Sequence, residues 1–380
     1  TPRLRDPDVV NFAPAFDSIN VGGNINLRLR QGVRETTAPV TGLPLKINVT
    51  ETYVPQTTEV ITHFRPGGSD PPLGEPDLGL FGASPQAMDS TYVFSLLTAG
   101  GNIIITGMAT TKIIHLTGNT DLLANGRIDA TTNGNINLTE LTGDFRVGAI
   151  TSTTGDVTLT ADASIVDAQG DAASDINAYN IFLEAISGFI GTLLDELEIN
   201  TGSAASAMLT ATAVLQVVIR EMQDDLKINH VFSSDGLIQL TVNETAASGE
   251  NLLVGPGKSV ITTGGSLTLL VGDNITIEGA LNSSGAMFIR GDFGNADSGV
   301  GSIIHIPGTF TAPNAEITGQ FDDDLVSLTN ITPGTVTTVQ TTSVAFRDAL
   351  MAAPAGRYFM VTSAAARSPK QNVAAYTALK

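Results

Sequence analysis

Apolar and polar residues alternate in short runs along most of the chain, and one recurring phrase carries the pattern. The phrase opens with a small or acidic turn pair and continues with alternating aliphatic and polar residues, as in Gly134–Thr139, Gly155–Thr160 and Gly236–Thr241. A period of two predicts β-strands that bury one of their two faces. The glycines that open each run predict tight turns between the strands.

The chain also repeats itself over a longer distance. Residues 135–161 align without a gap to residues 216–242, so the offset in numbering is 216 − 135 = 81. Apolar positions keep their places while the residues between them differ, which indicates a repeated structural unit rather than a repeated active site. Thus Leu138 matches Ile219, and Val157 matches Ile238.

Two acidic pairs recur within the same alignment. Glu140 matches Glu221, and Asp144 matches Asp225. We interpret these acids as marks of turns and outward faces of the repeated unit, and not as catalytic pairs.

The shorter phrase returns at a nearly constant step. Its glycines are separated by 155 − 134 = 21 between Gly134 and Gly155, and by 285 − 265 = 20 between Gly265 and Gly285. A unit this short cannot bury a face alone, but copies stacked at about 4.8 Å per layer pair in parallel and share one core. The sequence therefore predicts an all-β parallel β-helix, or solenoid, with rungs of about 20 residues. A doubly wound fold would need strands that are apolar on both faces and helical patterns between them, and the sequence shows neither.

One segment has the composition of a helix. Ala204–Val218 is rich in Ala, Leu and Met, which favour helices. The long repeat places the end of this segment at the start of a strand, so we expect strands there. A short helix near Ala204–Leu209 remains the alternative.

Three regions differ in their pattern. Residues 1–90 contain isolated strand signals at Ile19–Leu29 and Leu43–Tyr53, followed by a long excursion rich in Pro and Gly at residues 55–90. Residues 91–344 carry the regular β-helix pattern. Residues 345–380 lose the turn phrases and become basic, which predicts a C-terminal cap or a link to a following region.

Composition and charge limit the partners. The 380 residues include 39 Gly, no Trp and no Cys, and the net charge is −19. A surface of this sign repels phosphate backbones, so nucleic acid is not an expected partner, whereas divalent cations are candidates. No run approaches the roughly 18 apolar residues that a membrane span needs. The chain begins at Thr1 without a signal-peptide pattern, and we expect it to be a piece of a longer protein.

Some parallel β-helix proteins cut acidic polysaccharides, so their catalytic elements are the main alternative to a structural role. Asn119-Thr120-Asp121 resembles an element of the polygalacturonase family, and Asp322–Asp324 contains an Asp pair. The Gly-His-Gly and Arg-Ile-Lys elements of that family are absent from the sequence. No pair of carboxyls is singled out for glycoside hydrolysis. We therefore predict neither a catalytic site nor a site for an organic cofactor.

Metal binding has a better basis in the sequence. Asp292, Asn295 and Asp297 fall within one Gly-rich turn, where hard oxygen ligands can converge on Ca²⁺. A second set consists of Asp167, Asp171 and Asp175, and Asp322–Asp324 forms a third. In each set the alternative is that the carboxylates bond their own backbone as turn residues.

Three segments resemble the haemagglutinin-type repeats of giant bacterial surface proteins, the filamentous-haemagglutinin-like and RTX-type adhesins. They are TGDVTLTADASIVDA at residues 154–168, GDAASDINAYNIFLEAISGFIGT at residues 170–192 and LEINTG at residues 197–202. The similarity in repeat style covers roughly residues 91–344.

The resemblance implies a right-handed parallel β-helix that is secreted and held at the cell surface or in the extracellular matrix. It implies a non-catalytic stalk or filament used in adhesion or in building a biofilm matrix. The implied partners are other regions of a longer chain, further copies stacked end to end, and surface or matrix polysaccharide. A polysaccharide-active enzyme and a part of a phage or toxin are the alternatives.

Overall fold

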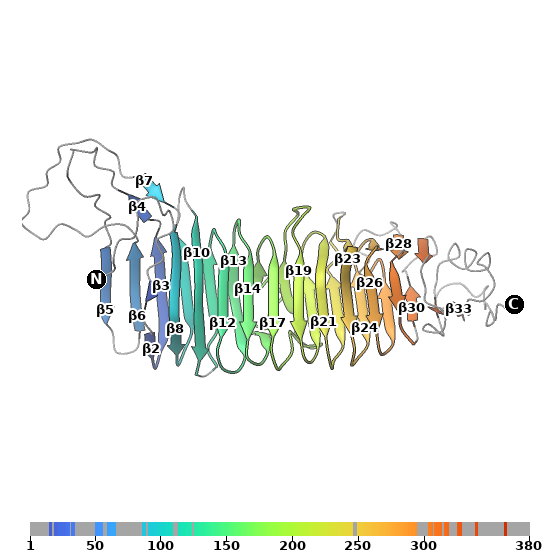
Figure 1. The fold of residues 1–380 in the computed structure, drawn as a ribbon, viewed down its shortest axis with the longest axis horizontal. Coiled ribbons are helices and arrows are strands. Elements are labelled where there is room, and N and C mark those ends of the chain that lie inside the picture. Colours follow the sequence, from blue (N-terminus) through green and yellow to red (C-terminus); the bar gives the residue numbers. More distant parts are fainter. Residues whose placement is uncertain are drawn as a thin grey trace, which may run out of the picture. The chain divides into compact units, whose positions relative to one another are not determined.

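The computed structural model describes only part of the 380 residues. The described residues are 15–16, 19–30, 32–34, 50–55, 59–65, 86–88, 90–108, 113–123, 125–245, 249–294, 303–306, 308–313, 315–318, 325–328, 339–340 and 361–362. The chain divides into two compact units, Thr1–Leu159 and Thr160–Lys380. Every regular element among the described residues is a β-strand (Figure 1).

The first unit contains strands from residue 15 onward, and its last strand crosses the boundary at residue 159. The strands are β1 (Ala15–Phe16), β2 (Ile19–Val21), β3 (Asn24–Arg30), β4 (Gly32–Arg34), β5 (Thr50–Pro55), β6 (Glu59–Arg65), β7 (Gln86–Met88), β8 (Ser90–Ala99), β9 (Ile103–Met108), β10 (Ile114–Leu122), β11 (Ile128–Thr132), β12 (Ile136–Glu140), β13 (Phe145–Ser152) and β14 (Val157–Ala161).

The second unit continues in the same style. Its strands are β15 (Ile165–Asp167), β16 (Ile176–Asn177), β17 (Ile181–Ala185), β18 (Leu197–Asn200), β19 (Leu209–Ala213), β20 (Val217–Glu221), β21 (Leu226–Ser233), β22 (Ile238–Val242), β23 (Leu252–Thr262), β24 (Leu267–Val271), β25 (Ile275–Ile277), β26 (Ala280–Ser283), β27 (Met287–Arg290), β28 (Ile303–Ile306), β29 (Thr309–Thr311), β30 (Ala315–Thr318), β31 (Leu325–Leu328), β32 (Val339–Gln340) and β33 (Val361–Thr362).

In the first unit the chain alternates between two parallel sheets. One has the order β1-β8-β10-β12, with β2 also on β8, and the other has the order β6-β3-β9-β11-β13. Strand β5 pairs with β6 in antiparallel fashion, and β4 pairs with β7 likewise. Strand β3 pairs with β9, and the residues between these two strands, 31–102, include the whole predicted excursion at residues 55–90. Most residues of that excursion lie outside the described part of the chain.

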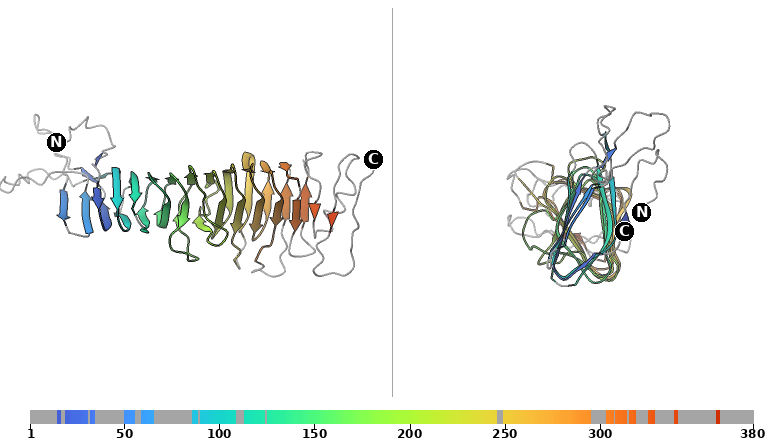
Figure 2. Two further views of the ribbon diagram at one scale, coloured as in Figure 1. Left: turned by 90° about the horizontal axis from the view of Figure 1, so that it is seen from below. Right: turned by 90° about the vertical axis from the view of Figure 1, so that its left-hand side faces the viewer.

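The second unit has the same two-sheet arrangement. One sheet runs β17-β19-β21-β23-β25-β28-β31, with β26 and β29 alongside, and the other runs β16-β18-β20-β22-β24-β27-β30-β32-β33. Within each unit the strands lie edge to edge in ladders (Figure 2). Of the predicted C-terminal cap at residues 345–380, only β33 is described.

The lengths of the rungs follow from the pairing registers. Leu116 pairs with Ile136, and Leu267 pairs with Met287, which are steps of 136 − 116 = 20 and 287 − 267 = 20. Other rungs are longer: Ile238 pairs with Leu267, a step of 267 − 238 = 29. The prediction of a parallel β-solenoid built from short rungs is confirmed, and the extra residues of the longer rungs lie between the paired strands.

The long repeat is reproduced strand by strand. Adding the offset of 81 to both ends of β12, β13 and β14 gives the ends of β20, β21 and β22. The Ala-rich segment before β20 also follows the register, because Leu209–Ala213 forms strand β19. The helix alternative near Ala204–Leu209 is wrong, since only a single turn closes there, through the Ala207 N–H and the Ala204 carbonyl.

The core of each unit consists of the aliphatic positions of the alternating pattern. Ile136, Leu138, Val157 and Leu159 have at most 1% of their surface exposed, as predicted from their phase. The positions between them carry polar side chains that are only half-buried, in agreement with one solvated face. Burying one such aliphatic side chain stabilises the fold by about 1.5–3 kcal/mol.

The turn glycines are required by the close approach of successive rungs. Gly236, Gly265 and Gly285 follow one another along the second unit, and a Cβ at Gly265 would lie 2.6 Å from the carbonyl carbon of Gly236. A Cβ at Gly285 would lie 2.8 Å from the Gly265 oxygen. Hydroxyl groups reinforce the same turns, since Thr262 Oγ1 and Ser283 Oγ donate to the carbonyls of Gly236 and Gly265 respectively. The recurring glycine of the sequence is therefore a steric requirement of stacking.

Replacing Gly265 with Ala is expected to destabilise the chain by about 1–3 kcal/mol, because the new methyl group overlaps the backbone of the neighbouring turn. Gly255 is the matched control in the same unit, since a Cβ there meets nothing closer than 3.9 Å. Urea unfolding of Gly265→Ala and Gly255→Ala measures both effects. Equal stability of the two variants would contradict the steric account.

Candidate metal centre

Acidic side chains are buried at several positions of the described chain, although acids are normally exposed. The buried acids are Glu140, Asp167, Asp175, Glu196, Glu198, Glu221, Glu250 and Asp292. Each needs hydrogen bonds, a cation or a proton, because an uncompensated buried charge is strongly unfavourable. They differ in how this need is met.

Glu140 and Glu221 are compensated by hydrogen bonds to the preceding rung. Glu140 Oε2 accepts from Thr120 Oγ1 at 2.7 Å, and Glu140 Oε1 accepts from the Leu122 N–H at 2.6 Å. At the matching place in the repeat, Glu221 Oε2 accepts from the N–H of Thr201 at 3.2 Å and from its hydroxyl at 3.1 Å. Thr120 and Thr201 are related by the same offset, since 201 − 120 = 81.

This geometry corrects the interpretation of the repeated acids as outward residues. Glu140 and Glu221 lie in phase with the aliphatic core positions and are at most 1% exposed. Asp144 is exposed, and Asp225 is a turn residue whose Oδ1 accepts from the backbone and side-chain amides of Asn251. The period-two pattern of Ile136–Glu140 places Glu140 on the same face as Ile136 and Leu138, which is the buried face.

The polygalacturonase-like element Asn119-Thr120-Asp121 lies within β10 and is engaged in the same network. Asn119 Nδ2 donates to the Ser95 carbonyl at 2.8 Å, and Asp121 Oδ1 accepts from Thr142 Oγ1 at 2.5 Å. Thr120 is fully buried. These three side chains connect neighbouring rungs.

Replacing Glu140 with Gln is expected to make stability less dependent on pH. Burial raises the pKa of Glu140 from 4.5 to about 7, so between these values the folded chain binds more protons than the unfolded chain. Stability is therefore lost as pH rises from about 4.5 to about 7, by on the order of 3 kcal/mol, and a neutral amide does not undergo this loss.

Urea unfolding at pH 5 and at pH 8 measures the effect, with Glu184→Gln as the control because Glu184 is exposed on β17. The control should keep the full pH dependence. If Glu140→Gln loses as much stability between the two pH values as the unmodified chain, Glu140 does not carry the proton.

Glu196 is compensated by a cation. Its Oε2 is paired with Arg220 Nε at 2.5 Å, and its Oε1 accepts from Gln239 Nε2 at 2.6 Å and from Thr241 Oγ1 at 2.9 Å. The side chain is thus fully satisfied, and the positive charge of Arg220 is engaged there.

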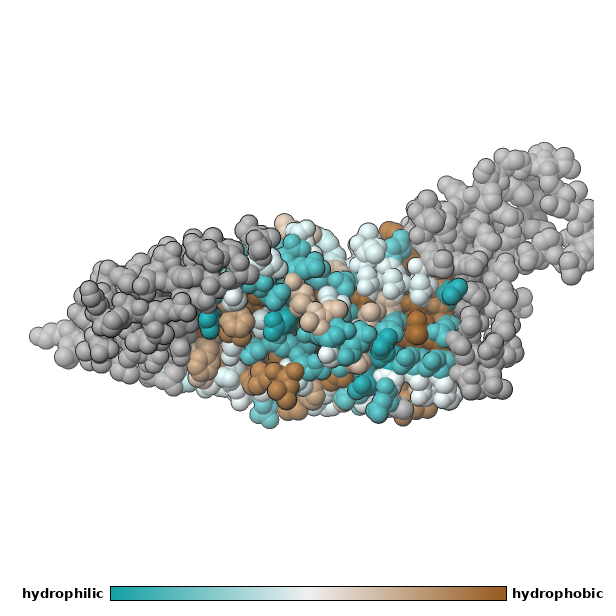
Figure 3. Space-filling model, turned by 180° about the vertical axis from the view of Figure 1, so that it is seen from behind, coloured by the Kyte–Doolittle hydropathy of each residue, from teal (hydrophilic) through white to brown (hydrophobic). Residues whose placement is uncertain are grey.

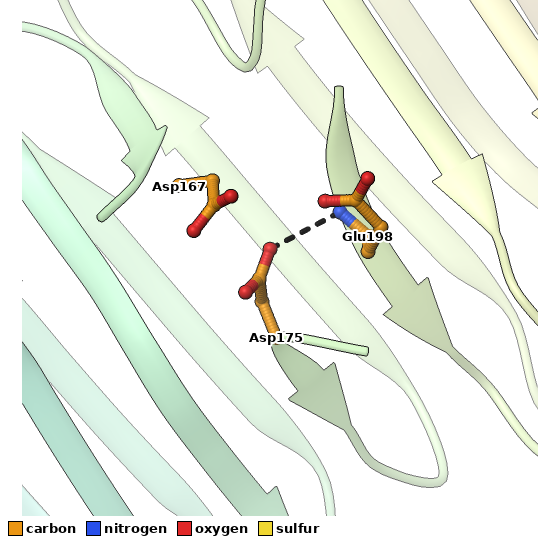
Figure 4. Close-up of side chains that lie close together, drawn as sticks. All are labelled: Asp167, Asp175 and Glu198. Carbon is orange, nitrogen blue, oxygen red and sulfur yellow. Dashed lines mark hydrogen bonds between the residues drawn. The ribbon is translucent and has the colours of Figure 1, made fainter. Parts of the chain in front are cut away.

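Asp167, Asp175 and Glu198 form the remaining cluster (Figure 4). Asp167 ends β15, Asp175 immediately precedes β16, and Glu198 is the second residue of β18. One carboxylate oxygen from each lies within 4.8 Å of those of the other two, and all three residues are buried. The cluster is therefore built from the two ends of the turn between β15 and β16 and from β18, the strand that pairs with β16.

Backbone hydrogen bonds fix the positions of these carboxylates. Asp167 Oδ1 and Oδ2 accept from the N–H groups of Gln169 and Gly170, both at 2.6 Å. Gly170 has φ +60°, a left-handed conformation that glycine adopts without strain. The Asp175 N–H donates to the Glu198 carbonyl at 2.9 Å, and Asp175 Oδ2 accepts from the Glu198 N–H at 3.2 Å.

The electrostatics of the cluster disfavour three ionised carboxylates. Burial raises the pKa of Asp175 to about 9, and the charge of Asp167 adds to the rise. Burial, and next the charge of Asp167, raise the pKa of Glu198 to about 7. The nearby Asp195 also has a raised pKa, from its burial and from Asp167. Chemically, the cluster can hold shared protons or one cation.

Glu198 also has an oxygen without any hydrogen bond. Its side chain is 7% exposed, and Oε2 is buried with no donor among the described residues. The Glu198 carboxylate lies close to the carboxylates of Asp167 and Asp175 (Figure 4). An orphaned carboxylate oxygen of this kind is unfavourable by about 1–3 kcal/mol or more unless a proton or cation meets it.

The structure brings together two residues of the predicted set Asp167, Asp171 and Asp175. Asp171 is exposed, and its Oδ1 accepts from the Ala173 N–H at 2.7 Å, so it serves as a turn residue. Glu198 was not predicted as a site residue, because its alternation with the core residues Leu197 and Ile199 gives it the phase of an outward position. Its burial departs from strict alternation of buried and solvated positions along the strand.

The predicted calcium set Asp292, Asn295 and Asp297 remains a prediction. Asp292 follows β27, is buried and has φ 52°. Asn295, Asp297 and the set Asp322–Asp324 lie outside the described residues.

No protein-family model, curated protein or solved structure matches this chain. The described part of the chain contains no helix with the length and hydrophobicity required of a membrane-spanning segment. The functional conclusion therefore depends on the fold and on the contacts of the chain itself.

Proposed function

We propose that this chain is a non-catalytic structural or adhesive segment of a large secreted bacterial surface or matrix protein. In this role the solenoid acts as a rigid stalk, or as a unit that stacks end to end in a filament. The observation that carries the proposal is the ladder of parallel backbone pairs that joins successive rungs within each unit. The extracellular location comes from the resemblance of residues 154–202 to haemagglutinin-type repeats.

The ladder gives a mechanical role a physical basis. Val217–Glu221 pairs over its full length with Ile238–Val242, which pairs over its full length with Leu267–Val271. Each backbone hydrogen bond contributes only about 0.5–1.5 kcal/mol net. The bonds between two rungs open together, however, because the aliphatic side chains beneath them are packed against both rungs. An open sheet edge also pairs readily with another chain, which is the basis of the filament form.

The contacts of the acidic residues support the structural role over the polysaccharide-cutting alternative. Glycoside hydrolysis needs two carboxyls that flank the sugar. In the described chain, Glu140 and Glu221 are directed into the core, and Thr120 of the polygalacturonase-like element is buried. A polysaccharide on the surface does not reach these groups.

The outer surface supports an adhesive use. Large apolar side chains are exposed on the second unit, including Phe182, Ile186, Leu194 and Leu215. Figure 3 shows apolar areas interspersed among hydrophilic ones on one face of the molecule. Exposed apolar patches are a common feature of protein interaction sites.

Removing one whole rung tests the structural role. Deleting residues 135–155 joins Gly134 to Asp156 and restores the turn phrase as GDVTLT. The shortened chain is expected to fold with an unchanged β-sheet circular dichroism spectrum. Its length in small-angle X-ray scattering should fall by about 5 Å, the thickness of one layer. A matched deletion of residues 135–145 breaks the register and should lose cooperative unfolding.

Incubating the purified chain with pectate, alginate and hyaluronan tests the enzymatic alternative. We expect no new reducing ends and no unsaturated sugars. Release of such products, abolished by Asp121→Asn, would establish the enzyme and overturn the proposal.

Failure of the one-rung deletion to fold would contradict the structural role, because a stalk of this kind depends on rungs that are interchangeable.

A further inference from the structure

The cluster of Asp167, Asp175 and Glu198 brings three buried carboxyl groups of the second unit close together. Asp167 receives two backbone N–H groups, but no described positive side chain is bonded to any of the three carboxylates. Arg220, whose charge reaches Glu198, is already paired with Glu196. The Glu198 carboxylate, with its orphaned Oε2, therefore differs from those of Glu140, Glu196 and Glu221, whose oxygens accept hydrogen bonds or pair with a cation.

We propose that Asp167, Asp175 and Glu198 bind one divalent cation, and that this cation is Ca²⁺. The buried Oε2 of Glu198 supplies an independent reason, because it has no hydrogen-bond partner and belongs to a carboxylate whose ligand oxygen lies within 4.8 Å of the other two. A cation among the three carboxylates is bound by the same carboxylate that carries this orphaned atom, and it neutralises the cluster.

The donor set selects the class of cation. All three donors are carboxylate oxygens, which suit hard cations, and the cluster includes no imidazole or thiolate. Ca²⁺ binds oxygen at about 2.3–2.6 Å, so its opposite ligands lie about 4.6–5.2 Å apart. Mg²⁺ binds at about 2.0–2.1 Å and needs every ligand pair within about 4.2 Å. The three carboxylate oxygens all lie within 4.8 Å of one another, which is inside the span of one Ca²⁺ coordination sphere. Ca²⁺ also accepts an irregular set of carboxylates, whereas Mg²⁺ demands near-ideal octahedral geometry.

The site has a mechanical consequence for the solenoid. Its ligands are the last residue of β15, the residue that precedes β16 and the second residue of β18, so one ion connects both ends of the turn between residues 167 and 175 to the strand that pairs with β16. Asp195 lies close to Asp167 and Gly170, where it adds negative charge to the cluster. Calcium binding is therefore expected to stabilise the second unit against unfolding, in proportion to the logarithm of the calcium concentration.

Titration of the EDTA-treated full chain with CaCl₂ tests the proposal, by isothermal calorimetry for stoichiometry and by thermal unfolding for stabilisation. We expect an increase in Tm with millimolar CaCl₂ and a smaller one with equal MgCl₂. Glu198→Gln and Asp175→Asn should each weaken Ca²⁺ binding at least tenfold. Because burial already disfavours ionisation of both carboxyls and the amides cannot ionise, both variants should fold and melt no lower than the unmodified chain without calcium.

Two control variants separate this site from the other acidic turns. Asp171→Asn changes an exposed acid of the same turn and should leave Ca²⁺ binding unchanged. Asp292→Asn removes an acid of the other predicted calcium set. Ca²⁺ binding at the cluster of Asp167, Asp175 and Glu198 should be unchanged in this variant. The proposal is overturned if the unmodified chain binds no Ca²⁺, or if Glu198→Gln and Asp175→Asn bind it as tightly as the unmodified chain.

Discussion

Parallel backbone pairing between successive rungs is the constraint on which the rest of the structure depends. It holds adjacent strands at about 4.8 Å, and at that spacing a turn backbone has no room for a side chain against its neighbour. The glycines of the recurring phrase follow from this, as the Cβ distances at Gly265 and Gly285 show. The hydroxyl groups that end the strands, such as those of Thr262 and Ser283, then satisfy the turn carbonyls.

The same stacking explains why charge is handled differently at different acids. A residue at a strand end, such as Glu140, receives donors from the rung before it, because the preceding turn lies beside it in the stack. Glu198 is inside a short strand, alternates with core residues and is covered nonetheless. Its Oε2 receives no donor from a neighbouring turn, so neutralisation has to come from a proton or an ion.

Much of the fold was predictable because spacing and phase are local properties of the sequence. The alternation of aliphatic residues in Ile136–Glu140 predicted a strand there. The long repeat predicted strands in the Ala-rich segment before Val217, where the composition favours a helix. The longer rungs were not predictable, since nothing in the periodic pattern limits the length of a loop between paired strands. The step from Ile238 to Leu267 is an example.

The site was only half predictable. Asp167 and Asp175 could be grouped because they are close in sequence, but Glu198 belongs to the next rung. Adding the predicted rung length of about 20 to Asp175 points to Asp195 and misses Glu198, because this rung has a step of 199 − 176 = 23 between Ile176 and Ile199. Alternation alone placed Glu198 in solvent, and burial of an outward position depends on the path of neighbouring loops, which period-two patterns do not encode.

Amide hydrogen exchange along the ladder tests the central claim of a cooperative stack most directly. The strand amides of β20, β22 and β24 are expected to exchange slowly and at a common rate, because each is released only when neighbouring rungs open together. The amides of the turn at residues 202–206 should exchange much faster. Strand amides that exchange independently of one another, at rates close to those of the turns, would contradict the account.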